Sequence, residues 1–88
     1  MMRRDLLGSP AAAGSGARDI VIGADTRSVH VTGGEVINFV VGATVFSWNF
    51  DVGTNVYSFP LNTVAPDALL AQTVTAYVAT DPRYLPAP

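Results

Sequence analysis

Cysteine and lysine are both missing from this chain. Without a thiol the protein forms no disulfide, builds no thiolate zinc site or iron–sulfur cluster, and has no cysteine nucleophile. All five cationic residues are arginines scattered along the chain: Arg3, Arg4, Arg18, Arg27 and Arg83. Nucleic-acid binding needs a concentrated basic face, so scattered arginines and a net charge of -2 argue against a nucleic-acid partner.

Charge of either sign is scarce: charged residues make up 14% of the chain, against roughly 25% in an average soluble protein. Apolar residues account for 49%, but they nowhere form the run of roughly 20 that spans a membrane, so no membrane insertion is expected. The acidic residues lack the spacing of a glycosidase pair or a calcium loop. A phosphate-binding glycine loop and a zinc-protease helix are also absent from the sequence, which predicts that the protein is not an enzyme.

The first residues show neither a periodic pattern nor a long apolar stretch. Residues 1–4, "MMRR", resemble the charged start of a secretory signal, but "DLLGSPAAA" after them lacks the apolar stretch that a signal needs. A gene start placed downstream of the true one would give the same pattern. The small residues of "GSPAAAGSGA" predict a flexible arm over residues 1–17, followed by one all-β domain over 18–80 and a proline-rich tail over 81–88.

Runs of alternating or β-branched residues predict about six strands, with turn signals every 8–12 residues or so. They cover residues 18–23, 28–32, 35–42, 44–52, 56–61 and 73–79. Gly33-Gly34 predicts a tight hairpin between the second and third strands, and Gly42-Ala43 a turn into the fourth. Pro60 indicates an edge strand, and one short helical turn is expected near residues 66–71. The predicted fold is a small antiparallel β-sandwich or barrel of the immunoglobulin-like or cupredoxin-like kind.

Three aromatic residues occupy alternate positions in "VFSWNFDV": Phe46, Trp48 and Phe50. Polar residues, among them Ser47 and Asn49, occupy the positions between them, which is typical of a strand with one buried face. An exposed platform that stacks a ligand is the alternative interpretation. Because each ring can bury about 150–250 Å², three of them would supply most of the core of so short a domain, and we predict that they do.

The single histidine, His30, alternates with Val29 and Val31 and is therefore expected on the solvent face of its strand. As a catalytic base it lacks a partner, since there is no cysteine and no serine in a nucleophile-elbow motif. As a metal ligand it would need help from Asp, Glu, Asn, Met or a second chain. An inert surface histidine is the other interpretation. "VTGGEVINFVVG" is similar to the start of cupredoxins, but a blue-copper site requires a cysteine and two histidines, and the sequence excludes it.

A framework of five segments runs through most of the chain: "DLLGSPA" (5–11), "IVIGADTRSVHVTGGEVINFVVG" (20–42), "FSWNFD" (46–51), "FPLNTVAP" (59–66) and "VTAYVATDPRY" (74–84). In this order the segments resemble the CzcE family, small periplasmic proteins associated with bacterial heavy-metal resistance. The resemblance implies that the protein has an all-β fold and is often dimeric. It also implies that the protein is exported to the periplasm and binds copper ions. The matching residues are structural, so they explain the fold and leave the metal ligands open.

The favoured hypothesis is therefore a non-catalytic periplasmic accessory protein of heavy-metal resistance that binds copper ions as a homodimer. His30 is the candidate metal ligand because it is the one strong nitrogen side-chain ligand in the sequence. Met1 or Met2 would assist with Cu(I) if either belongs to the mature chain. The alternative is a metal-independent β-sandwich interaction or dimerisation module, which pairs by edge strands or by the apolar second face of "EVINFVVG".

Overall fold

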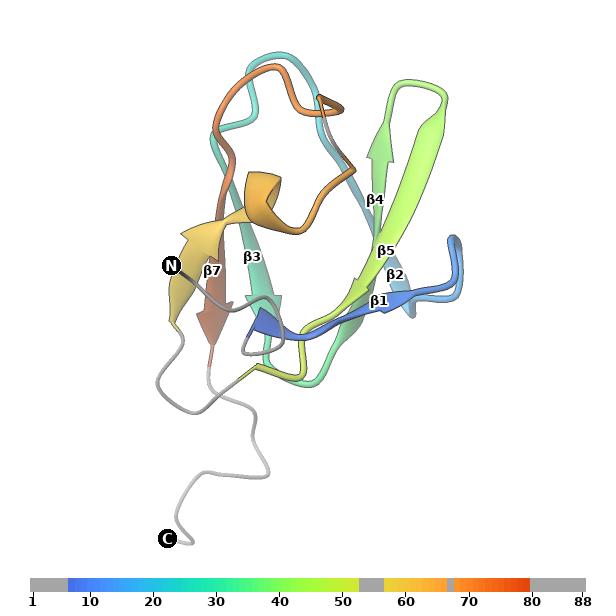
Figure 1. Cartoon of the computed structure of the whole chain (residues 1–88), viewed down its shortest axis with the longest axis vertical. Helices are drawn as coiled ribbons and strands as arrows, with labels where there is room; N and C mark the ends of the chain where they lie inside the picture. The colour runs from blue at the N-terminus through green and yellow to red at the C-terminus, as the bar shows by residue number, and fades with distance from the viewer. Residues whose placement is uncertain (1–6, 53–56, 67, 80–88) are drawn as a thin grey trace, which may run out of the picture.

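Two β-sheets face each other in the computed structural model, which describes residues 7–52, 57–66 and 68–79 (Figure 1). Sheet A has the strand order β1-β5-β4-β2, and sheet B has the order β3-β7-β6. The strands are β1 (Ser9–Ala11), β2 (Arg18–Val21), β3 (Ser28–Thr32), β4 (Val36–Val41), β5 (Thr44–Asn49), β6 (Ser58–Pro60) and β7 (Thr75–Ala79). The all-β fold is thus confirmed, and none of the described residues forms a helix long and apolar enough to cross a membrane.

Both sheets are mixed, whereas the strand pattern predicts antiparallel pairing throughout. Strand β2 pairs with β4 in parallel, and β3 pairs with β7 in parallel. The remaining pairs, β1 with β5, β4 with β5 and β6 with β7, are antiparallel. The parallel pairs arise because β3, which lies between β2 and β4 in the sequence, belongs to the other sheet, so the chain crosses over before it returns.

The two glycine turns have different outcomes. At Gly42, whose φ is 60°, a two-residue turn joins β4 to β5 with Val41 opposite Thr44, which confirms the predicted turn. The prediction of a hairpin at Gly33-Gly34 is wrong, because β3 and β4 lie in different sheets. The amide of Gly33 donates to the carbonyl of Ala79 and that of Gly34 to the carbonyl of Phe50, so this turn carries the chain from sheet B to sheet A.

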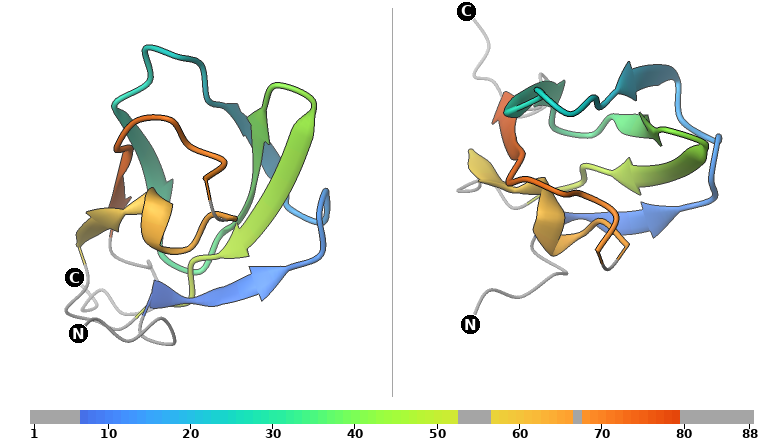
Figure 2. Two further views of the ribbon diagram at one scale, coloured as in Figure 1. Left: turned by 45° about the horizontal axis from the view of Figure 1, so that its top comes forward. Right: turned by 90° about the horizontal axis from the view of Figure 1, so that it is seen from above.

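The prediction of a flexible arm over residues 1–17 is wrong for residues 7–17, the part of that range that the structure describes. Leu7 is 2% exposed, and β1 pairs with β5 at the edge of sheet A (Figure 2). Pro10 lies within β1, which is compatible with an edge strand because one side of such a strand needs no donor. Residues 1–6 lie outside the described residues, as do the proline-rich tail predicted over 81–88 and residue 80.

The short helical turn also lies elsewhere. A 3-10 turn, η2 (Leu61–Thr63), follows β6 directly and buries Leu61 completely. Within the predicted range of 66–71, Leu69 donates its amide to the carbonyl of Pro66 at 3.2 Å, while residue 67 lies outside the described residues. As Pro60 predicts, β6 is an edge strand.

The aromatic residues form the core, as predicted. Phe46, Trp48 and Phe50 are 8%, 3% and 0% exposed. Phe39 of β4 stacks on Phe46 with ring centroids 5.1 Å apart, and it forms an edge-to-face pair with Phe50, with centroids 5.9 Å apart. Phe50 in turn lies 6.1 Å from Phe59 of β6, so one chain of rings connects sheet A to sheet B. The rings are therefore core residues and do not form an exposed platform for a ligand.

Candidate metal centre

His30 lies on the outer face of sheet B, as its alternation with Val29 and Val31 predicts. Both valines are 3% exposed and point into the core, whereas His30 is exposed. Its ring stacks on that of Tyr77, with centroids 5.3 Å apart and an angle of 17° between the planes. Because the lone pair of an imidazole nitrogen lies in the ring plane, a stacked neighbour covers a face of the ring and leaves the nitrogen edge open to a metal ion.

Strand register explains this contact. The parallel pairing of β3 with β7 places His30 beside Tyr77, and the antiparallel pairing of β6 with β7 places Ser58 on the other side of Tyr77. An imidazole, a phenol and a hydroxyl thus lie in one row across sheet B. The alternation within 73–79 already indicates that Tyr77 faces solvent, but its contact with His30 depends on a pairing between distant segments that no local pattern reveals.

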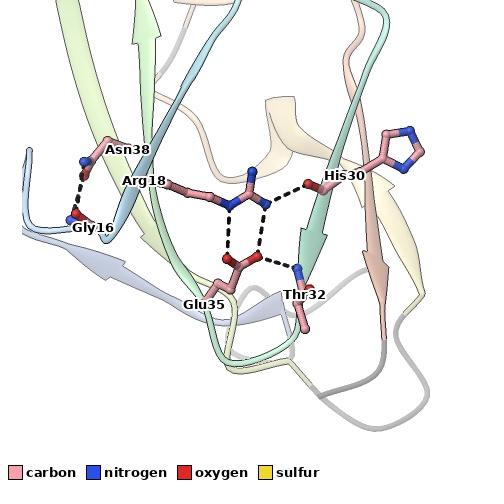
Figure 3. Close-up of polar contacts among 6 residues, drawn as sticks. All are labelled: Gly16, Arg18, His30, Thr32, Glu35 and Asn38. Atoms are coloured by element: carbon pink, nitrogen blue, oxygen red, sulfur yellow. Dashed lines mark hydrogen bonds and ion pairs between the residues drawn. The ribbon is translucent and has the colours of Figure 1, made fainter. Parts of the chain in front are cut away.

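A polar clasp fixes the backbone of His30 (Figure 3). Arg18 of β2 donates through Nη2 to the carbonyl of His30 at 3.0 Å, and through Nε and Nη2 to the two carboxylate oxygens of Glu35 at 3.0 and 3.1 Å. Glu35 also accepts the amide of Thr32 at 2.7 Å. The imidazole points away from this clasp, so its nitrogens remain outside the ion pair.

The clasp shifts the pKa of both charged groups. The hydrogen bond from Arg18 lowers the pKa of Glu35, burial opposes that change, and the Thr32 amide reinforces it. The hydrogen bond to Glu35 likewise raises the pKa of Arg18, against the effect of burial. Glu35 is therefore held as a carboxylate that is already engaged by three donor groups, and it is not positioned to complete a metal site at the outward-facing imidazole.

Within residues 7–52, 57–66 and 68–79, no three or more His, Cys, Asp and Glu side chains lie together as metal ligands would. In the described part of the chain His30 is therefore a single strong nitrogen donor with open positions around it. That arrangement fits an exposed, partly formed site and does not fit an enclosed one. Met1 and Met2, expected to assist with Cu(I), lie outside the described residues.

Comparison with known proteins identifies the family. A profile of the family described as "Heavy-metal resistance protein CzcE" matches residues 5–85. The chain belongs to the CzcE family. Its structure is similar to the crystal structure of the apo form of CzcE from C. metallidurans CH34, with a TM-score of 0.77 and 27% sequence identity over 88% of this chain and 85% of that one. No curated protein sequence matches the chain.

Membership of the CzcE family confirms the resemblance that the sequence framework indicates. It also associates the chain with heavy-metal resistance, the role by which the family is described. The sequence framework includes core residues such as Phe39, Phe46 and Trp48. Family membership therefore accounts for the fold and does not by itself identify metal ligands in this chain.

A second polar cluster, on sheet A, is structural. Asn38 and Ser47 are 6% and 4% exposed, and the Ser47 hydroxyl donates to Asn38 Oδ1 at 2.6 Å. Asn38 Oδ1 also accepts the amide of Gly16 at 2.7 Å, and its Nδ2 donates to Asp19 at 2.7 Å. Because these groups satisfy one another, the cluster attaches the segment after β1 to the sheet and offers no open ligand set.

A shallow, open pocket of about 290 Å³ lies beside the end of β4, and sequence analysis did not indicate it. Its wall is mostly apolar and includes Ile22, Val41, Leu69 and Leu70. Gln72 also lines it, but the Gln72 amide already donates to the carbonyls of Gly23 and Thr26, both at 2.9 Å. The lining contains no carboxylate, imidazole or sulfur side chain, so the pocket lacks the strong side-chain ligands of a metal site.

Proposed function

We propose that this member of the CzcE family is a non-catalytic accessory protein that binds copper ions in the periplasm through His30. The observation that carries the proposal is the exposed imidazole, oriented by Tyr77 and set on a backbone that Arg18 holds. Imidazole nitrogen is a good ligand for Cu(II), which binds nitrogen and oxygen donors more tightly than the other divalent first-row metals do. The periplasmic location and a homodimeric state follow from the family resemblance and belong to the same proposal.

Calorimetric titration of Cu(II) into the purified protein and into His30→Ala tests the proposal. We expect the substitution to weaken binding by at least about tenfold, because it removes the nitrogen ligand itself. Val21→Ala is a matched control, since Val21 is 72% exposed and lies on the other sheet. Equal copper binding by wild type and His30→Ala, or none by either, would reject His30 as the ligand.

The alternative, a metal-independent interaction module, is favoured by a row of valines across the outer face of sheet A. Val21 of β2 lies beside Val40 of β4, which lies beside Val45 of β5. Val21 and Val45 are 72% and 39% exposed. Light scattering without metal would support this function if wild type forms a dimer that Val21→Arg dissociates, and a metal-free monomer would contradict it.

A further inference from the structure

The pocket beside the end of β4 is walled by apolar side chains that the fold leaves half-buried. It lies where the turn after β2, the turn between β4 and β5 and the segment before β7 meet at one end of the two sheets (Figure 1). Val41, Leu69 and Leu70 are partly buried and pack against the core, and Ile22 beside them belongs to the core. A molecule that fills the pocket would bury these side chains further, and the burial of apolar surface favours binding.

Backbone strain accompanies the pocket wall. Ala68, directly before Leu69, has a φ of 62°, and in the described part of the chain it is the one residue other than glycine with a positive φ. Side chains rarely adopt this left-handed conformation, which persists where the surrounding structure imposes it and is concentrated at ligand-binding sites. The wall is therefore held in a shape that its own backbone does not favour.

Gln72 supplies a polar group whose orientation is fixed. Its Nε2 donates to the carbonyls of Gly23 and Thr26, both at 2.9 Å, which uses both hydrogens of the amide. The reversed amide would set its oxygen against two carbonyl oxygens, so Oε1 is the atom left over. Within the described residues Oε1 accepts no hydrogen bond, and it is available to a donor group on a ligand.

Charge and size restrict the class of ligand. Every residue that lines the pocket is uncharged, and an ion that entered it would lose water without gaining a counter-charge. The volume of about 290 Å³ is at the lower limit of ligand pockets, which span roughly 300–1,000 Å³. Since an apolar cavity of about 150 Å³ accommodates benzene, a molecule with one ring and a polar substituent fits here.

We propose that this pocket binds a small uncharged apolar molecule of the phenol class, whose hydroxyl donates a hydrogen bond to Gln72 Oε1. Val41, Leu69 and Leu70 would contact its apolar part. The pocket contains neither His30 nor Tyr77, so this binding site is separate from the candidate metal centre and does not depend on the proposed function.

Nuclear magnetic resonance of the methyl groups of Val41, Leu69 and Leu70 tests the proposal on the unaltered full-length protein. We expect phenol to produce saturable shifts of these methyl signals. Anisole, which has the same ring but no donor, is expected to bind roughly two- to tenfold more weakly, the effect of one lost hydrogen bond. Benzoate carries a charge and is expected to bind at least about tenfold more weakly than phenol.

Ala24→Phe places a ring at an exposed residue of the pocket lining, and we expect the clash to weaken phenol binding by at least about tenfold. Ala13→Phe introduces the same ring at an exposed position outside the lining and is the matched control, expected to bind phenol as wild type does. Thermal unfolding establishes that both variants are folded. Shifts that do not saturate, or that are equal in Ala24→Phe and wild type, would overturn the site. Equal binding of anisole and phenol would overturn the role of Gln72, and equal binding of benzoate and phenol would overturn the uncharged class of ligand.

Discussion

Arg18 and Glu35 form a two-point ion pair that connects β2 to the turn between the two sheets, with N–O distances of 3.0 and 3.1 Å. The same guanidinium donates to the carbonyl of His30 on sheet B. Because Arg18 lies in sheet A, one side chain ties the strand that carries the candidate ligand to the opposite sheet. The pair is therefore placed to affect both stability and the position of the candidate metal centre.

Glu35→Gln is expected to destabilise the fold by about 1 kcal/mol or less. The side chains of Arg18 and Glu35 are 46% and 30% exposed, and ion pairs that solvent screens contribute about 0.2–1 kcal/mol. Urea denaturation at neutral pH measures the change. Asp51→Asn removes the same charge at an exposed position and is expected to change stability by less than about 0.5 kcal/mol, so equal effects of the two substitutions would contradict a specific role for the clasp.

The stabilisation from Glu35 is expected to depend on pH in one direction. Its pKa is lower in the folded state than the usual 4.5, chiefly because Arg18 donates to its carboxylate. The folded state thus binds the proton less readily than the unfolded state, and the stabilisation is complete above about pH 5–6 and is lost as pH falls below 4.5 through the folded pKa. Urea midpoints of wild type and Glu35→Gln should accordingly converge at low pH. A difference that stays constant from neutral pH to pH 3 or so would contradict this.

Gly8→Ala is expected to destabilise the protein by about 2 kcal/mol or more, because backbone strain and a steric collision combine at this position. Gly8 has a φ of 113°, and a Cβ at this position would collide with the carbonyl oxygen of Asn49 and lie 2.7 Å from Trp48 Nε1. The indole donates to the carbonyl of Leu7 at 2.8 Å, so the collision would displace the segment that precedes β1. Unfolding followed by Trp48 fluorescence measures the loss.

Gly14→Ala is the matched control for that prediction. Gly14 also has a positive φ, of 83°, but no atom lies within 4 Å of a Cβ built there. Backbone strain alone costs about 1 kcal/mol at such a site. The difference in stability loss between Gly8→Ala and Gly14→Ala therefore measures the cost of the collision with sheet A. Similar losses of stability from both substitutions would show that β1 docks loosely.

Asn38→Ala is expected to cost about 1–3 kcal/mol and to release the segment after β1. The substitution removes the acceptor for the Gly16 amide and the Ser47 hydroxyl within a buried cluster, and unsatisfied buried donors are costly. Hydrogen exchange at the amide of Gly16 should accelerate far more than exchange at the amide of Phe50, which donates to the carbonyl of Glu35. Unchanged protection at Gly16 would contradict the attachment.

Sequence reasoning predicts those features that depend on neighbouring residues. The turn at Gly42 and the buried stripe of Phe46, Trp48 and Phe50 follow from local alternation and one tight turn, and the exposure of His30 follows from the same period of two. Features that depend on pairing between distant segments are not predictable in this way. They include both parallel strand pairs, which require the chain to change sheets.

Strand β1 is a second feature that local sequence patterns do not predict. Three residues, Ser9–Ala11, pair with β5 through the backbone, and their small side chains carry no hydrophobic alternation that a pattern could reveal. The contacts of Arg18 with Glu35 and of His30 with Tyr77 are equally non-local. The candidate ligand could be named from the sequence, but the clasp and the stacking ring that position it could not.

Substitutions of Tyr77 test whether its stacked ring positions the His30 imidazole for copper binding. Tyr77→Phe keeps an aromatic ring beside His30 and should leave copper affinity within about threefold of wild type. Tyr77→Ser removes a stack worth about 0.5–1.5 kcal/mol, and because the imidazole must then be ordered on binding, we expect affinity to fall by roughly two- to tenfold.

Calorimetric titration with Cu(II) measures both affinities, and the nitrogen coupling in electron paramagnetic resonance reports whether the imidazole is still the ligand. The rescue by Phe is the decisive comparison, since a phenolate that bound copper directly would be lost equally in both variants. With stacking planes only 17° apart, the ring covers the face of the imidazole, and the nitrogen lone pair lies in the imidazole plane. Equal weakening in Tyr77→Phe and Tyr77→Ser would therefore assign Tyr77 as a ligand and contradict the positioning role.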